Sequence, residues 1–249
     1  MKSVRTALRV FEEVAACQPV GLSELSRRLD VPKASVQRAL TTLADAGWLR
    51  HDVGQPGQWV VTARFSVLAD ASPAVITARD AARPLLRSLR EKAEGWSGFF
   101  VLDGDRMVLL AGPEESTLRS HEAALGPLPV HVSAAGRAIL ARLPDDQVEE
   151  VLARSLPAGA DADELGRHVR ERVAEARRDG FAVVHGEYVD TLGVVAAAIV
   201  DQTSTPVAGL AVMVPIERLE NGDGEELGAL LVDAAEQVSL AVRDSQGDT

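Results

Sequence analysis

Residues 22–49 read LSELSRRLDVPKASVQRALTTLADAGWL. Apolar residues recur at helical spacing on both sides of Asp30-Val31-Pro32, which indicates two amphipathic helices joined by a short turn. We expect Ser23 to cap the first of these helices, since its hydroxyl is a good N-cap acceptor. The second helix is expected to span about 33–46 and to end at Gly47. The stretch therefore predicts a helix-turn-helix.

The residues on either side extend this pattern. An apolar stripe from Val4 to about Ala16 predicts a helix before the stretch, and QPVG (18–21) is interpreted as the turn that ends it. Short strands are predicted at 48–52 and 58–61, around a Gly/Pro-rich turn. Three helices and a hairpin are typical of a winged helix-turn-helix, whose second paired helix lies in the DNA major groove. We assign residues 1–63 to a DNA-binding domain.

The formal net charge of −11 is the main objection to DNA binding. The charge is uneven, however. Residues 1–65 contain nine Lys and Arg against six Asp and Glu, an excess of three positive charges, so the remainder of the chain carries −14. Because counterion release depends on the charges near the phosphates, an acidic second domain does not exclude DNA binding by the first.

The rest of the chain predicts an α+β domain. A linker helix is expected at 64–75, followed by a break at Ser72-Pro73 and a longer helix that Pro84 interrupts. Residues 76–249 then form the second domain, in which grouped strands favour a mainly antiparallel sheet. Its strands are predicted at 96–102, 106–112, 116–123, 181–189, 194–201 and 206–214, and its helices at 134–142, 145–155, 161–179 and 223–243.

Composition excludes several classes of protein. A single cysteine, Cys17, rules out an internal disulfide and a cysteine-rich zinc site, and we interpret it as a small packed residue. The five histidines (51, 121, 131, 168 and 185) show no metal-ligand spacing. No apolar run approaches the ~18 residues of a membrane span, and the N-terminus does not resemble a signal peptide. We expect a soluble, cytoplasmic protein that has no cofactor and does not contact a membrane.

Motifs for catalysis are missing from the sequence. It has neither a Gly-x-Ser-x-Gly elbow nor a Gly-rich phosphate loop. The adjacent acids Glu114-Glu115 and Asp145-Asp146 are explained by solvation or helix capping. We therefore predict that the protein is not an enzyme.

Four segments resemble the IclR family of bacterial transcriptional regulators, in the family's order along the chain. They are 3–15, 21–50, LPVHVSAAGRAILARLP (128–144) and 178–201. The resemblance implies a winged helix-turn-helix, a linker helix and a C-terminal effector-binding domain similar to the GAF fold. It also implies homodimers, often paired into tetramers, on palindromic operators. The family's usual Ser-Thr and His in the recognition helix are replaced here by Ala34-Ser35 and Gln37, which leaves the operator sequence open.

The polar face of the second paired helix supplies the candidate DNA contacts. Glutamine pairs bidentately with adenine, arginine with guanine, and Ser or Thr with bases or phosphates. Lys33, at the helix N-terminus, is placed for a phosphate. Arg27, Arg28 and Arg50 are either backbone contacts or solvated residues. The candidate readers are Ser35, Gln37, Arg38, Thr41 and Thr42.

The candidate effector site is carried over from the family by alignment. Its helix start is Ser133-Ala134-Ala135-Gly136, and the strand positions where relatives carry polar groups are Val184, Leu192, Val194, Ala211 and Met213. An apolar lining does not offset the desolvation of a small charged acid. We therefore expect a larger, mainly apolar or aromatic effector, or no natural ligand. The alternative is that these are core residues and the ligand binds elsewhere.

These observations favour a ligand-responsive, homo-oligomeric regulator that binds an operator in double-stranded DNA. Two alternatives stay open. The first is an enzyme or small-molecule binding protein whose helix-turn-helix serves only packing or dimerisation. The second is an architectural DNA-binding protein without a ligand.

Overall fold

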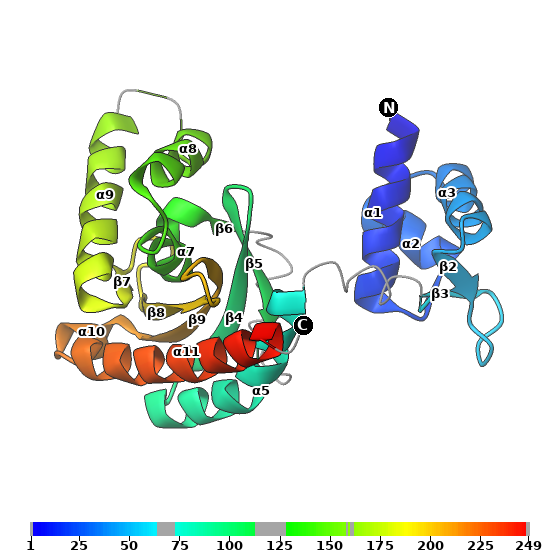
Figure 1. Ribbon diagram of the computed structural model, residues 1–249. Coiled ribbons are helices and arrows are strands. Elements are labelled where there is room, and N and C mark those ends of the chain that lie inside the picture. The colour runs from blue at the N-terminus through cyan, green and yellow to red at the C-terminus, as the bar shows by residue number, and fades with distance from the viewer. Residues whose placement is uncertain (1, 64–72, 113–127, 158, 160–161, 248–249) are drawn as a thin grey trace. The chain divides into compact units, whose positions relative to one another are not determined.

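The computed structural model describes residues 2–63, 73–112, 128–157, 159 and 162–247, and the chain divides into two compact units, 1–72 and 73–249 (Figure 1). Most of the expected linker helix at 64–75 lies outside the described residues. So do the expected strand at 116–123, Glu114-Glu115 and His121.

The N-terminal unit contains three helices and a small sheet. Leu25, Val36, Leu40 and Trp59 are among the buried residues of its core. The sheet is antiparallel with the order β1-β3-β2, and the predicted helices and hairpin are confirmed. The short strand β1, which pairs with β3, was not predicted. The elements are α1 (Lys2–Cys17), β1 (Val20–Gly21), α2 (Leu22–Leu29), α3 (Lys33–Asp45), β2 (Leu49–His51) and β3 (Gln58–Val61).

The prediction that Ser23 caps α2 is wrong. Val20 and Gly21 pair with Trp59 and Gln58 in the sheet, so α2 begins directly after β1 with Gly21 as its N-cap. Ser23 consequently lies inside the first turn. Gly47 follows the end of α3 as expected, and its φ of 80° is a conformation that favours glycine.

The C-terminal unit is built on a six-stranded antiparallel sheet with the order β6-β5-β4-β9-β8-β7, which confirms the α+β prediction. Its strands are β4 (Trp96–Asp103), β5 (Arg106–Ala111), β6 (Leu128–Pro129), β7 (Ala182–His185), β8 (Leu192–Val200) and β9 (Pro206–Pro215). Its helices are α5 (Pro73–Ala93), η1 (Val130–Val132), α7 (Ala134–Leu140), α8 (Asp145–Ser155), α9 (Ala162–Asp179), α10 (Ile216–Glu220) and α11 (Gly224–Gly247).

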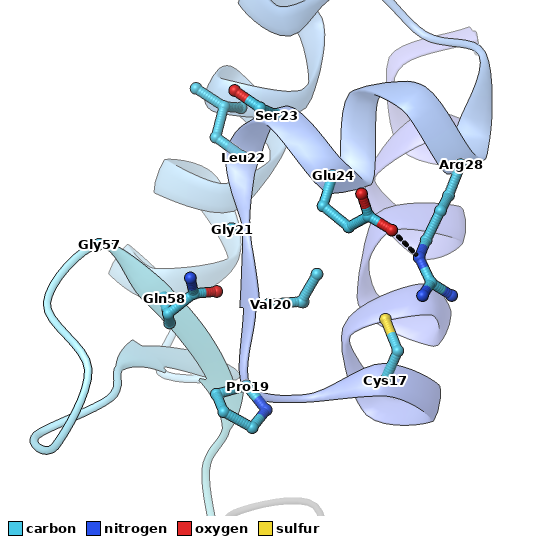
Figure 2. A pocket seen from close by; sticks show the side chains of 10 residues that line it. All are labelled: Cys17, Pro19, Val20, Gly21, Leu22, Ser23, Glu24, Arg28, Gly57 and Gln58. Carbon is cyan, nitrogen blue, oxygen red and sulfur yellow. Dashed lines mark hydrogen bonds and ion pairs between the residues drawn. The ribbon is translucent and has the colours of Figure 1, made fainter.

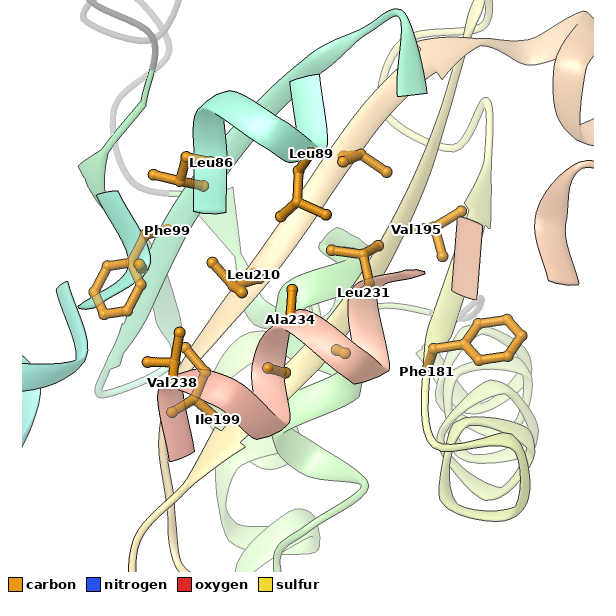
Figure 3. Packing of buried hydrophobic residues seen from close by; sticks show 14 of the residues in the cluster. Leu86, Leu89, Phe99, Phe181, Val195, Ile199, Leu210, Leu231, Ala234 and Val238 are labelled. Carbon is orange, nitrogen blue, oxygen red and sulfur yellow. The ribbon is translucent and has the colours of Figure 1, made fainter. Parts of the chain in front are cut away.

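Two apolar clusters cover the two faces of this sheet, because successive strand residues point to opposite sides. On one face, Val195, Ile199 and Leu210 pack against α5 and α11, which lie side by side (Figures 1 and 3). On the other face, Ala196 and Ala211 pack under α7, α8 and α9. The sheet is thus the middle layer of three.

The predicted longer helix is confirmed, since α5 runs from Pro73 to Ala93 and continues through Pro84. Proline removes one backbone hydrogen bond, at a cost of about 3 kcal/mol. Pro84 lies on the exposed side of the helix, so the carbonyl that loses its donor, on the exposed residue Asp80, is available to water. Burial of the opposite side, which includes Ala82 and Leu86, outweighs the remaining cost.

The strand predicted at 181–189 is shorter than expected. The chain turns at Gly186, where φ is 65° and the backbone N–H donates to the Leu192 carbonyl at 3.0 Å. This turn ends β7 at His185 and starts β8 at Leu192. It also places Glu187 in the connection between β7 and β8, where it contacts Arg137 of α7.

Candidate nucleic-acid interface and effector site

The candidate DNA-reading residues share one side of α3. Val36, Ala39 and Leu40 bury the opposite side against the N-terminal core. This division follows from the 3.6-residue period of the helix, which separates an apolar stripe from a polar face. Ser35 is half-buried, and the exposed members are Lys33, Gln37, Arg38, Thr41 and Thr42.

Surface hydrogen bonds order this polar face. Arg38 donates from Nη2 to Ser35 Oγ at 3.1 Å, and Thr42 Oγ1 donates to the Arg38 carbonyl at 2.8 Å. Gln37 Nε2 lies 3.4 Å from Thr41 Oγ1. The Arg38 and Gln37 bonds are to exposed hydroxyls, so a base edge can replace them without leaving a buried group unpaired.

The N-terminus of α3 has no side-chain cap, since its N-cap residue is Pro32. The backbone N–H groups of a first helical turn carry partial positive charge and attract anions. Lys33, exposed at this end, adds a full positive charge. The arrangement suits a DNA phosphate.

The arginines of α2 are already paired with acids. Arg27 and Arg28 both contact Glu24, at 2.5 Å and 2.7 Å, and Arg28 also reaches Glu13 at 3.3 Å. Hydrogen bonds from Arg27 and Arg28 hold the pKa of Glu24 below its ordinary value. The two arginines are therefore partly neutralised at the surface. Arg50, on β2, is exposed and donates to the His51 carbonyl at 3.1 Å.

A surface hollow of about 700 Å³ lies beside β1 and is bordered by Cys17, Glu24 and Arg28 (Figure 2). The Cys17 thiol donates to the Glu13 carbonyl at 2.8 Å. Burial and the neighbouring Glu13 carboxylate raise the pKa of the thiol, so it stays protonated at neutral pH. A protonated thiol is a poor nucleophile and metal ligand, as expected for a packing residue.

The candidate effector residues of the strands form rows across the second sheet. Val184 pairs with Val194, Val194 with Met213, and Met213 with Trp96, in one register across β7, β8, β9 and β4. All four side chains belong to the cluster beneath α7, α8 and α9. Ala211 lies in the adjacent row, opposite Gly98. Leu192 is half-buried and pairs with Pro215 at the start of β8.

The start of α7 lies over the sheet at Gly209, beside these rows. Ser133 caps the helix, accepting a hydrogen bond from the Gly136 N–H at 3.3 Å. Ala135 Cβ is 3.2 Å from the position that a side chain on Gly209 would take, and Gly136 is pressed against the Val130 backbone. These helix residues, with Ala134, are buried. Val194 and Met213, further along the central strands, stay half-buried.

Two further buried residues near these rows, Trp96 and Arg137, were not predicted from the sequence as site residues. Trp96 is buried with 7% exposure, and its indole Nε1 has no hydrogen-bond partner among the residues that the structure describes. Arg137, on α7, is fully buried. Periodicity assigns both to packed elements but does not identify their partners. An arginine within an apolar helix was the available signal for the second group.

Arg137 is held by a polar network. Its Nε donates to the His131 carbonyl at 2.9 Å, Nη1 donates to Glu187 Oε1 at 2.6 Å, and Nη2 donates to Glu187 Oε2. Burial alone would raise the pKa of Glu187, but the hydrogen bonds and charge of Arg137 outweigh it and hold that pKa below its ordinary value. The pair ties α7 to the turn between β7 and β8.

The histidines of the described residues lie in separate environments. His51 stacks on Trp59, His168 Nε2 is 3.7 Å from Glu187, and His131 Nδ1 shares a hydrogen bond with Ser155 Oγ at 2.6 Å. Burial lowers the pKa of His131, as does the nearby Arg137 charge. Within the described part of the chain, no three His, Cys, Asp or Glu residues gather as a metal site.

A winged helix-turn-helix with an exposed polar recognition face, joined in one chain to a separate α+β unit, defines a class: DNA-binding transcription factors with a sensory domain. The model of the IclR helix-turn-helix domain matches residues 3–53, and that of the bacterial transcriptional regulator IclR C-terminal domain matches residues 74–240. The chain belongs to the IclR family of bacterial transcriptional regulators.

Similar proteins cover nearly the whole chain. The Escherichia coli transcriptional repressor IclR is 30% identical over 97% of this chain and 90% of its own length. An IclR homologue from Microbacterium hydrocarbonoxydans, crystallised with 4-hydroxybenzoate, has a TM-score of 0.71 at 22% identity, covering 97% of this chain and 99% of its own. Thermotoga maritima IclR gives a TM-score of 0.68 at 18% identity, with coverages of 97% and 99%. No helix among the described residues meets the length and hydropathy of a membrane span.

Proposed function

We propose that α3 reads a palindromic operator through Ser35, Gln37, Arg38 and Thr41. The observation that carries this proposal is the exposed polar face of α3, which ends at an uncapped, positively charged N-terminus. Gln37 and Arg38 supply base contacts, Thr41 and Ser35 support them, and Lys33 and Thr42 contact phosphates. Arg50 adds a backbone contact from β2, and Arg28 a weaker one because Glu24 and Glu13 compete for it.

The protein works as a homo-oligomer, because two symmetric heads match the two half-sites of a palindrome. As a regulator acting on the chromosome, it is cytoplasmic and has no catalytic role. The C-terminal unit binds a small effector that favours one arrangement of the heads over another.

The effector site lies on the sheet face beneath α7, around Val194 and Met213. Ser133, Ala134, Ala135 and Gly136 form its helix side, and Val184, Leu192 and Ala211 complete its strand side. The apolar rows support a mainly apolar or aromatic ligand. The Microbacterium homologue binds an aromatic acid, 4-hydroxybenzoate, in its crystal structure. The C-terminal unit of this chain is proposed to bind an aromatic compound.

Selection of bound fragments from random duplex DNA, followed by footprinting, tests this function. We expect a protected two-fold symmetric site whose half-sites are about one helical turn apart, or a multiple of that. Binding is expected to weaken steeply with salt. Selection that enriches no common sequence would contradict the operator proposal.

Replacing Glu24 with Gln is expected to strengthen DNA binding. The substitution removes the acid that Arg27 and Arg28 share, so both become available to phosphates. Each added phosphate contact steepens the plot of log affinity against log salt by about 0.9. Fluorescence anisotropy at several salt concentrations measures this slope.

Glu150→Gln is the matched control for this prediction. It removes an acid from an exposed i,i+4 pair with Arg154 in the C-terminal unit. An equal change of slope in both variants would show that only the net charge matters, and it would contradict a role for Arg27 and Arg28 at the DNA.

A further inference from the structure

The indole N–H of Trp96 is a buried donor that has no acceptor in the described part of the chain. Trp96 is more than nine-tenths buried, and Nε1 makes no hydrogen bond within the structure. Removing a donor from water without pairing it costs free energy, so buried donors are nearly always satisfied. An unpaired donor therefore calls for a partner from outside the described chain.

The donor belongs to the row of strand residues at the proposed effector site. Trp96 is the direct cross-strand partner of Met213, which pairs in turn with Val194. Met213 and Val194 lie in β9 and β8, two interior strands of a covered sheet face, yet both stay half-buried. Since Ala196 and Ala211 in the next row are fully covered, the open part of this face lies on the Trp96 side.

The fold keeps the indole ring in this position. A side chain on Gly98 would come within 2.3 Å of the Trp96 ring, and one on Gly112 within 3.2 Å. Both glycines therefore leave space for the six-membered part of the ring. Phe100 adds an edge contact at 6.0 Å between ring centroids. The ring is fixed from the protein side, and its N–H stays unpaired.

The charged groups near Trp96 determine whether a neutral or an anionic hydrogen-bond acceptor can bind there. Among the buried residues that the structure describes, the permanent cation is Arg137, and both of its terminal nitrogens already donate to Glu187. His131 shares its Nδ1 with Ser155. A carboxylate in an apolar site needs an available cation or several donors to offset its desolvation. Without an available cation, the indole N–H is enough for a neutral acceptor but not for an anion.

We propose that Trp96 donates a hydrogen bond from Nε1 to an uncharged acceptor, a carbonyl or ether oxygen, on an aromatic effector that lies over Met213 and Val194. The proposal rests on the proposed effector function and names the chemical class of its ligand. Methionine suits a position directly beneath an aromatic ligand, because its thioether contacts aromatic rings favourably and its flexible side chain adapts to their shape. Trp96 is then the residue that selects ligands with an acceptor over plain hydrocarbons.

Three probes of nearly equal size test this class: 2-acetylnaphthalene, 2-ethylnaphthalene and 2-naphthoate. By calorimetry or thermal shift, the wild-type protein is expected to bind the ketone about 10-fold more tightly than the hydrocarbon, and the carboxylate more weakly than the ketone. Trp96→Phe keeps an aromatic ring but has no donor, so its ketone preference is expected to fall to near unity. Trp59→Phe, which changes a buried tryptophan of the N-terminal unit, is expected to retain the full preference.

Nuclear magnetic resonance of the three indole N–H groups gives a direct readout. The Trp96 signal, identified by its loss in Trp96→Phe, is expected to shift downfield with the ketone and to move less with the hydrocarbon. A structural role alone would not produce this difference. If Trp96→Phe retained the ketone preference, or if the carboxylate bound most tightly, the proposal for Trp96 would be overturned. If none of the three probes bound, the effector site itself would be misplaced, while operator binding would stand as a separate result.

Discussion

Glu187→Gln is expected to lower the free energy of unfolding of the C-terminal unit by about 3–5 kcal/mol. The guanidinium of Arg137 is fully buried, and the carboxylate of Glu187 is the charge that balances it. Glutamine keeps the size of the side chain but leaves the buried cation uncompensated. Urea unfolding, followed by circular dichroism, measures the change.

The companion variants make this prediction specific to the ion pair. Arg137→Met is expected to cost less than Glu187→Gln, because the Glu187 side chain is one-quarter exposed and has His168 nearby. The double variant is expected to recover part of the loss, since it removes both charges together. Glu150→Gln, in an exposed pair, should change stability by at most about 1 kcal/mol. Equal losses in Glu187→Gln and Glu150→Gln would contradict the argument.

Acidification is expected to destabilise the same unit in two stages. In the folded protein, burial holds the pKa of His131 below its ordinary 6.5, and Arg137 holds the pKa of Glu187 below its ordinary 4.5. The unfolded chain therefore binds more protons at acid pH, and stability falls as pH falls. Both contributions are complete above pH 6.5. The first is lost below that value, and the second below about 4.5.

Unfolding midpoints measured between pH 8 and pH 3 test this order. The Glu187→Gln variant should retain the first stage and show a smaller second stage than the wild-type protein. A stability curve that is flat from pH 7 to pH 5 would show that His131 is not coupled to folding, and one that stays flat from pH 5 to pH 3 would show the same for Glu187.

Gln37→Ala combined with Arg38→Ala is expected to abolish operator recognition. A good bidentate base contact contributes about 1–3 kcal/mol of discrimination, so the loss of two corresponds to roughly 30-fold or more in affinity for the operator. Both side chains are exposed on α3 and bond only to neighbouring surface groups, so the fold is expected to survive. Anisotropy with operator and scrambled duplexes at one salt concentration measures the effect.

Arg243→Ala is the charge-matched control for the double variant. Arg243 is an arginine of α11 that pairs with Glu236, in the unit that does not carry α3. It is expected to bind the operator as the wild-type protein does. If the double variant lost affinity equally for operator and scrambled DNA, Gln37 and Arg38 would act through phosphates rather than bases.

Much of the fold could be predicted from the sequence because its signals are local. The periodicity of residues 22–49, with Gly47 at the end, defined both helices of the DNA-binding motif within two residues of their observed ends. The strands predicted at 96–102 and 106–112 are observed as β4 and β5, which pair antiparallel. An error arose where a distant partner competed with local preference: the pairing of β1 with β3 moved the cap of α2 from Ser23 to Gly21. Packing on α11 helps to keep α5 continuous through Pro84.

The candidate sites show the same difference between local signals and long-range contacts. The exposed face of α3 could be listed from spacing, because helix geometry alone separates its buried and exposed positions. The effector site could not be listed in full. Trp96 joins Met213 and Val194 only through the register of β4, β9 and β8, which are far apart in the chain.

The sequence by itself determined the class of this protein, its helix-turn-helix and the polarity of each element, since these depend on residues within one or two turns of one another. Only the tertiary structure decided that Arg28 is shared between acids, that Arg137 is buried against Glu187 and that the Trp96 donor is unpaired. Each of these depends on groups brought together over long sequence separations, where burial removes water and makes an unpaired charge or donor costly.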